Sequence, residues 1–145
     1  VKPTEYLNSY ELIQEAKFVI VYNSSIGLEA TLFGKAVICG GKARYTQYPI
    51  VIFPDSVSAM IEKINELLFE DTIQVPAVFM RNARRFLYYQ LYRTSIPMDE
   101  YIQEMPRMGF VGLKQFSWQS LLAKNSNPLD IITTGILEDK PFLMP

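Results

Sequence analysis

The stretch FVIVYNSSIGLEATLFGKAVICGGKARY, residues 18–45, decides the expected fold of this chain. Residues 18–22 are a continuous apolar and β-branched run, which is typical of a strand buried on both faces of a parallel sheet. Residues 23–25, Asn-Ser-Ser, are of the types that begin helices, because their side-chain oxygens accept backbone N–H groups. Residues 26–33 then have room for about two helical turns. The sequence therefore predicts a strand, a tight loop and a short helix.

A second strand is expected to follow this helix. Gly34 suits the left-handed position just past a helix end, and residues 36–39 form another short apolar run. Gly40 and Gly41 free the backbone directly after it, and residues 49–53 predict a third strand. Ligands of such α/β units bind at the carboxyl ends of the strands. We therefore predict an α/β fold with a Rossmann-like parallel sheet.

The polar residues of this βαβ unit are the candidates for a binding site. Ser24 and Ser25 lie where the start of a helix offers free N–H donors to an anion. Glu29 follows in the first turn, and two interpretations remain open: it accepts hydrogen bonds from a pair of sugar hydroxyls, or it caps its own helix. A capping box needs Ser or Thr three residues earlier, where Ile26 stands, so the first interpretation is favoured.

Two basic residues follow the second strand. Lys42 and Arg44 are placed to neutralise a diphosphate lying over the Gly40-Gly41 loop. The alternative is an ordinary solvated basic loop, and the sequence does not decide between the two.

The same residues resemble the donor-side motif of capsule polysaccharide biosynthesis proteins. That motif reads N-S-[ST]-x-G-x-E-A, then G-K-P-V-I, then a glycine and a tyrosine. The agreeing positions are Asn23, Ser24, Ser25, Gly27, Glu29, Ala30, Gly34, Lys35, Val37, Ile38, Gly41 and Tyr45. Ala36 departs, since proline is usual there. The resemblance covers residues 9–68 and is thin afterwards.

The resemblance implies the C-terminal nucleotide-sugar domain of a GT-B glycosyltransferase that builds capsule or other surface polysaccharide. Ser24 and Ser25 would then hold phosphates, Glu29 the ribose hydroxyls, and the Gly40-Gly41 loop the base or sugar. The full set of expected donor-binding residues is Asn23, Ser24, Ser25, Gly27, Glu29, Gly40, Gly41, Lys42, Arg44 and Tyr45. No cofactor is expected beyond the nucleotide-sugar substrate.

The resemblance also implies partners that this chain does not contain. A saccharide or lipid-linked acceptor and the general base would be held by an amino-terminal domain. Val1 is not a methionine, and the strand and His-Pro motif usual before this region are not found, so we expect a fragment or remnant that is inactive alone. Two other functions remain open: a nucleotide-sugar epimerase, or a non-catalytic interaction module of a polysaccharide assembly complex.

Composition sets the outer limits. The chain has 145 residues, 49% of them hydrophobic and 20% charged, as expected of one globular domain. Its net charge of −1 gives no case for a nucleic-acid partner, and it has no histidine for a catalytic triad or a metal site. Cys39 is its single cysteine, which excludes an intrachain disulfide and predicts a buried, reduced thiol. No run is long enough to span a membrane, so a cytoplasmic location is expected.

Two helices are expected to flank the strands. The first begins near Ser9, with Leu12, Ile13 and Ala16 on its buried side. The second follows Asp55 or Ser56 as its cap. Its expected buried stripe is Val57, Met60, Ile61, Ile64, Leu67 and Leu68. We expect a Rossmann-like unit over residues 1–70.

Residues 71–145 are expected to form a helical C-terminal extension. A helix over residues 76–92 carries Arg81, Arg84, Arg85, Tyr88, Tyr89 and Tyr92. This side either attracts an anionic acceptor or the headgroups of the inner membrane leaflet, or packs its aromatics on a neighbouring domain. Short helices are expected at residues 97–104, 118–122 and 128–137, with Pro106 and Gly109 as breaks and Asn127 as the last cap.

Overall fold

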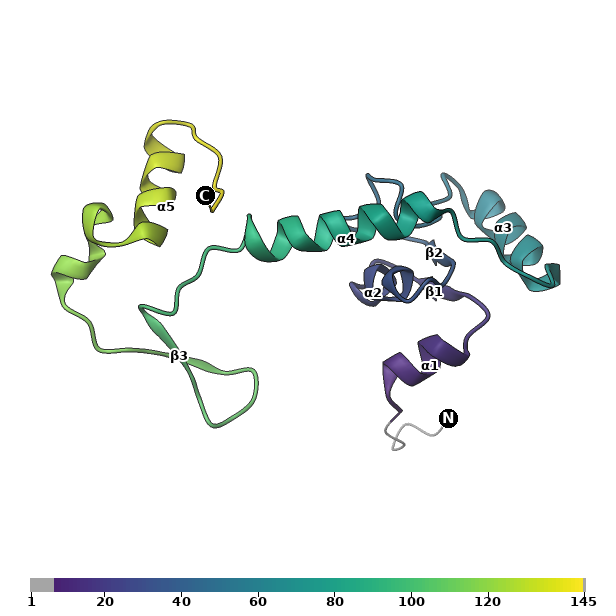
Figure 1. Cartoon of the computed structure of the whole chain (residues 1–145), viewed down its shortest axis with the longest axis horizontal. Coiled ribbons are helices and arrows are strands. Elements are labelled where there is room, and N and C mark those ends of the chain that lie inside the picture. Colours follow the sequence, from purple (N-terminus) through teal and green to yellow (C-terminus); the bar gives the residue numbers. More distant parts are fainter. Residues whose placement is uncertain (1–6, 145) are drawn as a thin grey trace. The chain divides into compact units, whose positions relative to one another are not determined.

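The computed structural model describes residues 7–144 (Figure 1). The chain divides into two compact units: the N-terminal unit ends at Leu87 and the C-terminal unit begins at Tyr88. The N-terminal unit contains α1 (Ser9–Glu15), β1 (Val19–Val21), α2 (Ile26–Leu32), β2 (Val37–Cys39), α3 (Val57–Phe69) and most of α4 (Ala77–Tyr92). The C-terminal unit contains the end of α4, β3 (Ile102–Glu104), β4 (Val111–Leu113), 3₁₀ turns η1 (Trp118–Leu121) and η2 (Ala123–Asn125), and α5 (Asn127–Leu137).

The predicted βαβ unit is present. β1 and β2 are parallel, with Val19 opposite Val37, and α2 connects them (Figure 1). The expected third strand is reduced to one parallel bridge between Ile38 and Ile52. The Ile52 N–H donates to the Val37 carbonyl at 2.8 Å, and the Ile52 carbonyl accepts from the Cys39 N–H at 2.9 Å. The chain is thus a mixed α/β protein with a small parallel sheet.

The two faces of this sheet are covered differently. One face contributes Val21, Val37 and Cys39 to a core that includes Leu28 of α2. On the other face, Ile38 packs with Leu67 of α3. The prediction that the first strand is buried on both faces is wrong for Ile20, which is 48% exposed while its neighbour Ile38 is fully buried. The reason is that β1 is an edge strand, and the cluster around Leu67 includes Ile38 but not Ile20.

The N-cap residues of α1 and α5 lie one position before the predicted ones, whereas that of α3 is as predicted. Asn8, rather than Ser9, caps α1 by accepting from the Tyr10 N–H at 2.9 Å. Ser56 caps α3 as predicted, by accepting from the Ala59 N–H at 3.1 Å. Ser126 holds the N-cap position of α5, where Asn127 was expected.

The predicted buried stripes of α1 and α3 are too wide. Ile13 of α1 is buried, but Leu12 is exposed. On α3, Met60, Ile64 and Leu67 face the sheet. The apolar α3 residues left exposed are Val57, Ile61, Leu68 and Phe69. A helix on a sheet of two short strands has only a narrow surface to pack against, so the flanking apolar positions remain in water.

The C-terminal unit holds a hairpin where a helix was expected. β3 and β4 pair antiparallel, with Gln103 opposite Gly112, so the helix predicted over residues 97–104 is wrong. The predicted breakers form the turn of this hairpin: Gly109 adopts a φ of 81°, a value that glycine reaches without strain. Residues 118–121 form a 3₁₀ turn rather than an α-helix, whereas α4 and α5 lie within about one residue of their predicted bounds.

Candidate functional site

The candidate site lies at the carboxyl ends of β1 and β2, where two loops meet. The Gly40 N–H donates to the Val21 carbonyl at 2.8 Å, and the Gly41 N–H donates to the Tyr22 carbonyl at 2.5 Å. The Tyr45 hydroxyl donates to the Ser24 carbonyl at 2.5 Å. The structure therefore brings together residues 22–25 and 40–45. The sequence predicts them at the same edge of the sheet only because each segment follows one of two parallel strands.

Gly27 and Tyr45 form the buried support of these loops. Tyr45 is only 3% exposed, and burial raises the pKa of its hydroxyl. A Cβ atom on Gly27 would lie 2.5 Å from the Tyr45 hydroxyl oxygen and 2.9 Å from Val21 Cγ2. Glycine at position 27 thus allows the tyrosine to reach the Ser24 carbonyl, and both residues shape the site from beneath it.

The loop before α2 has free donors. Ser25 holds the N-cap position with helical dihedral angles and makes no side-chain cap bond. Ser24 Oγ accepts from the Ile26 N–H at 3.4 Å, a long bond. Within residues 7–144, the N–H groups of Asn23, Ser24 and Ser25 donate to no acceptor. Because α2 has only seven residues, these loop N–H groups matter more for anion binding than the helix dipole does.

Glu29 bonds to α1 and not to its own helix start. Its Oε2 accepts a hydrogen bond from the Tyr10 hydroxyl at 2.7 Å, and the Tyr10 ring lies 5.8 Å from that of Phe33. The self-capping alternative for Glu29 is therefore not what the structure shows. Nothing in the sequence marks Tyr10 as a partner, since it lies 19 residues away with no motif connecting them.

The Tyr10–Glu29 hydrogen bond leads us to predict how the Tyr10 hydroxyl titrates at alkaline pH. The bond to the Glu29 carboxylate raises the pKa of Tyr10 above its ordinary value of 10.0. Because the pKa is raised in the folded state, the bond stabilises the fold below the ordinary tyrosine pKa and is lost as the pH rises through the raised value. The ultraviolet titration of the chain minus that of Tyr10→Phe should show one tyrosine with a midpoint above 10.0.

The control for this titration is Glu29→Gln, which keeps the shape of the side chain and removes its charge. In that background the Tyr10 midpoint should fall back toward the ordinary range. A midpoint unchanged by Glu29→Gln would contradict the assigned hydrogen bond.

The remaining predicted residues are exposed at the rim. Asn23, Lys42 and Arg44 are exposed, and neither Lys42 nor Arg44 forms an ion pair with a residue of the described part of the chain. Gly41 is buried beneath Tyr22, since a Cβ atom there would lie 2.9 Å from the Tyr22 ring. Tyr22 itself is exposed. The sequence does not mark it as a site residue, because it ends an apolar run that is typical of a buried strand.

Cys39 lies directly under these loops. It is fully buried, as predicted, and its Sγ lies 3.1 Å from the carbonyl oxygens of both Tyr22 and Gly41. The thiol thus contacts the backbone of both loops from below and offers no surface to a substrate.

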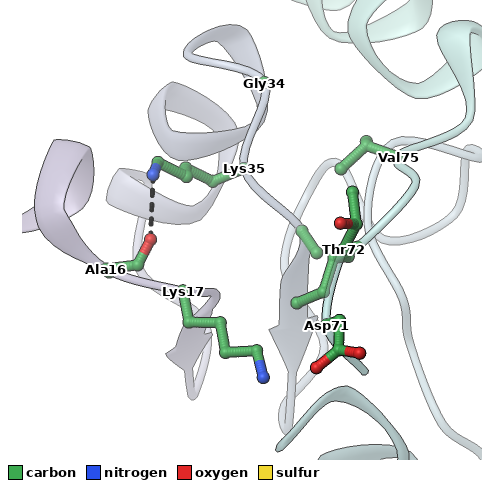
Figure 2. Close-up of a pocket in the computed structure, with 9 residues that line it drawn as sticks. Ala16, Lys17, Gly34, Lys35, Asp71, Thr72 and Val75 are labelled. Carbon is green, nitrogen blue, oxygen red and sulfur yellow. Dashed lines mark hydrogen bonds between the residues drawn. The ribbon is translucent and has the colours of Figure 1, made fainter. Parts of the chain in front are cut away.

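A pocket of about 310 Å³ lies at the opposite edge of the sheet (Figure 2). Lys17 and Lys35, which precede the two strands, line it together with Asp71 and Thr72. Both ammonium groups already close helix ends. Lys35 Nζ donates to the Ala16 carbonyl at 2.8 Å, the bond drawn in Figure 2, and Lys17 Nζ donates to the Leu68 carbonyl at 2.7 Å. These lysines hold α1 and α3 in place and are not free for a ligand.

Residues 7–144 contain neither a metal-binding cluster nor a membrane-spanning helix. No three His, Cys, Asp or Glu side chains come close enough together to hold a metal ion. None of the helices in this range combines the length and the apolar character needed to cross a membrane.

Comparisons with known proteins assign no relative. The chain matches no protein-family model, and neither the curated proteins nor the solved structures include a significant match to it.

Proposed function

We propose that the N-terminal unit binds the nucleotide part of a sugar donor, as the C-terminal domain of a GT-B type glycosyltransferase that builds capsule or other surface polysaccharide. The observation that carries this proposal is the loop of residues 23–25, whose three consecutive N–H groups have no acceptor within residues 7–144. Successive free backbone donors at the carboxyl edge of a parallel sheet suit a diphosphate. We also propose that the full domain has a Rossmann-like fold.

The diphosphate would lie between the two loops. Ser24 and Ser25 supply N–H and hydroxyl donors from one side. Lys42 and Arg44, exposed and unpaired with any described acidic residue, supply positive charge from the other. Gly40 is exposed, so a phosphate or sugar can approach the loop there. A Cβ atom at this position would lie 3.2 Å from Met60 Cε, so its glycine serves the packing against α3.

The nucleoside would use Glu29 and Tyr22. The Glu29 carboxylate has one oxygen bonded to Tyr10, which leaves acceptor capacity for a ribose hydroxyl. The exposed ring of Tyr22 offers a flat surface on which a base can stack. Catalysis would then come from positioning and from stabilising the departing phosphate, with the acceptor and the general base held by an amino-terminal domain.

Nucleotide titration tests the proposal. We expect uridine, cytidine, guanosine or adenosine diphosphate to bind the 145-residue chain in calorimetry, and Glu29→Gln to weaken that binding about tenfold through loss of a charged hydrogen bond. Tyr10→Phe is the matched control: it removes the same Tyr10–Glu29 bond but leaves the carboxylate, so the affinity should hold or rise.

Two results would count against this assignment. If none of the four nucleotides binds the unaltered chain, the donor-site proposal fails. If Glu29→Gln and Tyr10→Phe lower the melting temperature alike and leave the affinity unchanged, Glu29 serves only to hold α1 against α2.

The two alternative functions differ in whether they use the proposed nucleotide site. A nucleotide-sugar epimerase would need the same phosphate and ribose contacts, and it would convert the donor without an acceptor. A non-catalytic module of a polysaccharide assembly complex would keep the fold and bind no nucleotide. The free donors of residues 23–25 favour a nucleotide-binding role over the second alternative. In the proposed role the protein acts in the cytoplasm, at the inner face of the membrane.

A further inference from the structure

One oxygen of the Glu29 carboxylate already has a partner from another helix. The Tyr10 hydroxyl donates to Glu29 Oε2 at 2.7 Å, and the centres of the Tyr10 and Phe33 rings lie 5.8 Å apart. The first turn of α1 therefore rests on α2 through one hydrogen bond and one ring contact. Tyr10 leaves the acceptor capacity of the other carboxylate oxygen, Oε1, unused.

A ribose presents two neighbouring hydroxyls to such a carboxylate. Two adjacent donors are best matched when each has a carboxylate oxygen of its own. The first ribose hydroxyl can use Oε1 of Glu29 while Tyr10 stays in place. The second hydroxyl would need Oε2, where the Tyr10 oxygen already lies at hydrogen-bond distance. The Tyr10 hydroxyl thus holds the place of the second ribose hydroxyl.

The first turn of α1 can leave α2 without the loss of the whole helix. Tyr10 is 47% exposed, so its ring has solvent to move into. The other half of α1 is held independently: Ile13 is buried in the main core, and Lys35 Nζ donates to the Gln14 carbonyl at 2.7 Å. Displacement of Tyr10 would therefore free the first turn and leave the rest of α1 attached.

We propose that Tyr10 is an autoinhibitory contact of the donor site, and that the second ribose hydroxyl of a bound nucleotide displaces it from Glu29 Oε2. This regulation rests on the proposed nucleotide-binding function and concerns the same site. The nucleotide and α1 compete for one carboxylate, so the affinity for a ribonucleotide is lowered by the cost of breaking the Tyr10–Glu29 bond. Binding in turn releases the first turn of α1 from α2.

Ribonucleotides and deoxyribonucleotides separate the two hydroxyls. The probes are the diphosphates of uridine, cytidine, guanosine and adenosine, and the deoxy counterpart of each, which lacks one ribose hydroxyl. In a chain with isotope-labelled tyrosine, the nuclear magnetic resonance signal of Tyr10 Cζ is assigned by its loss in Tyr10→Phe. We expect a ribonucleotide to shift this signal, because the hydrogen bond breaks. The deoxy counterpart should leave it in place, because its single hydroxyl needs only Oε1.

A pair of phenylalanine variants tests the competition by calorimetry. Tyr10→Phe keeps the ring against Phe33 and should raise the affinity for ribonucleotides about two- to fivefold, a small gain because the broken bond is exposed. Its affinity for deoxyribonucleotides should be unchanged. The matched control is Tyr48→Phe, since Tyr48 is 50% exposed and its ring centre also lies 5.8 Å from that of a phenylalanine, Phe86. Within residues 7–144 no carboxylate accepts from the Tyr48 hydroxyl, so neither affinity should change.

Three results would overturn the autoinhibitory role while leaving the donor site intact. A ribonucleotide that binds without shifting the Tyr10 signal would show that ribose and Tyr10 share the carboxylate. An equal gain in affinity for both kinds of nucleotide in Tyr10→Phe would show that the second hydroxyl is not the competitor. A loss of ribonucleotide affinity in Tyr10→Phe, with an unchanged melting curve, would make Tyr10 a support for Glu29. If no diphosphate binds the unaltered chain, the donor site itself fails, and the autoinhibitory role fails with it.

Discussion

Replacing Gly27 with alanine is expected to lower the free energy of unfolding of the N-terminal unit by about 3 kcal/mol, the upper part of the range for overpacking a core. The new Cβ would lie 2.5 Å from the Tyr45 hydroxyl oxygen and 2.9 Å from Val21 Cγ2. Neither neighbour can move cheaply. Tyr45 is buried and bonded to the Ser24 carbonyl, and Val21 belongs to β1. Urea denaturation followed by far-ultraviolet circular dichroism measures the change.

Gly41→Ala is the matched control for this prediction. Its Cβ would also fall within 3.0 Å of a tyrosine ring, that of Tyr22, but this ring is 74% exposed and can turn into solvent. We expect a loss of less than about 1 kcal/mol. If both glycine variants lower the free energy of unfolding equally, then the freedom of the facing tyrosine ring to move does not determine the size of the loss.

A double variant isolates the cause. Tyr45→Phe removes the hydroxyl that the Gly27→Ala methyl would meet, so the two substitutions together should cost about 1 kcal/mol less than the sum of the single changes. Exact additivity would show that Val21 or the α2 backbone, and not Tyr45, makes glycine necessary at position 27.

Gly27 and Tyr45 also show how much of the role of each motif residue can be predicted from the sequence. The resemblance marks Gly27 and Tyr45 together as expected donor-binding residues. The structure shows that they contact each other and support the loop, so part of the motif serves the shape of the site rather than contact with a ligand. Ser24 and Ser25 are exposed, and within residues 7–144 their backbone N–H groups donate to no acceptor.

Local signals predicted the βαβ unit well, and contacts between distant residues account for what was missed. The runs at residues 18–22 and 36–39, with the polar triplet and Gly34 between them, locate β1, α2 and β2 without further information. The Tyr10–Glu29 bond joins residues with no shared pattern, so only the tertiary structure reveals it.

The hairpin was missed for a different reason. Pro106 and Gly109 are residue types that also end helices. The strands beside them have only three residues each, too few to show an alternating pattern. The pairing of Glu104 with Val111 is visible only once the turn between them is known to close.

Ile38→Ala is expected to lower the free energy of unfolding by about 2 to 5 kcal/mol, the largest loss predicted for a single substitution in this chain. Ile38 is fully buried on β2, packs with Leu67 of α3 and forms the bridge to Ile52. Truncation removes most of an apolar side chain and leaves a cavity that a strand held on both edges cannot close.

Ile20→Ala provides the comparison within the same sheet. Ile20 pairs with Ile38 across the two strands, so the two side chains share one sheet face, residue type and strand pairing and differ in burial. Because Ile20 is 48% exposed, its truncation should cost less than about 1 kcal/mol. Urea denaturation of the two variants gives both values. A loss for Ile20→Ala as large as that for Ile38→Ala would mean that, in solution, another surface covers the outer strand β1. The burial on both faces that the apolar run of residues 18–22 predicts would then be correct for the protein in solution.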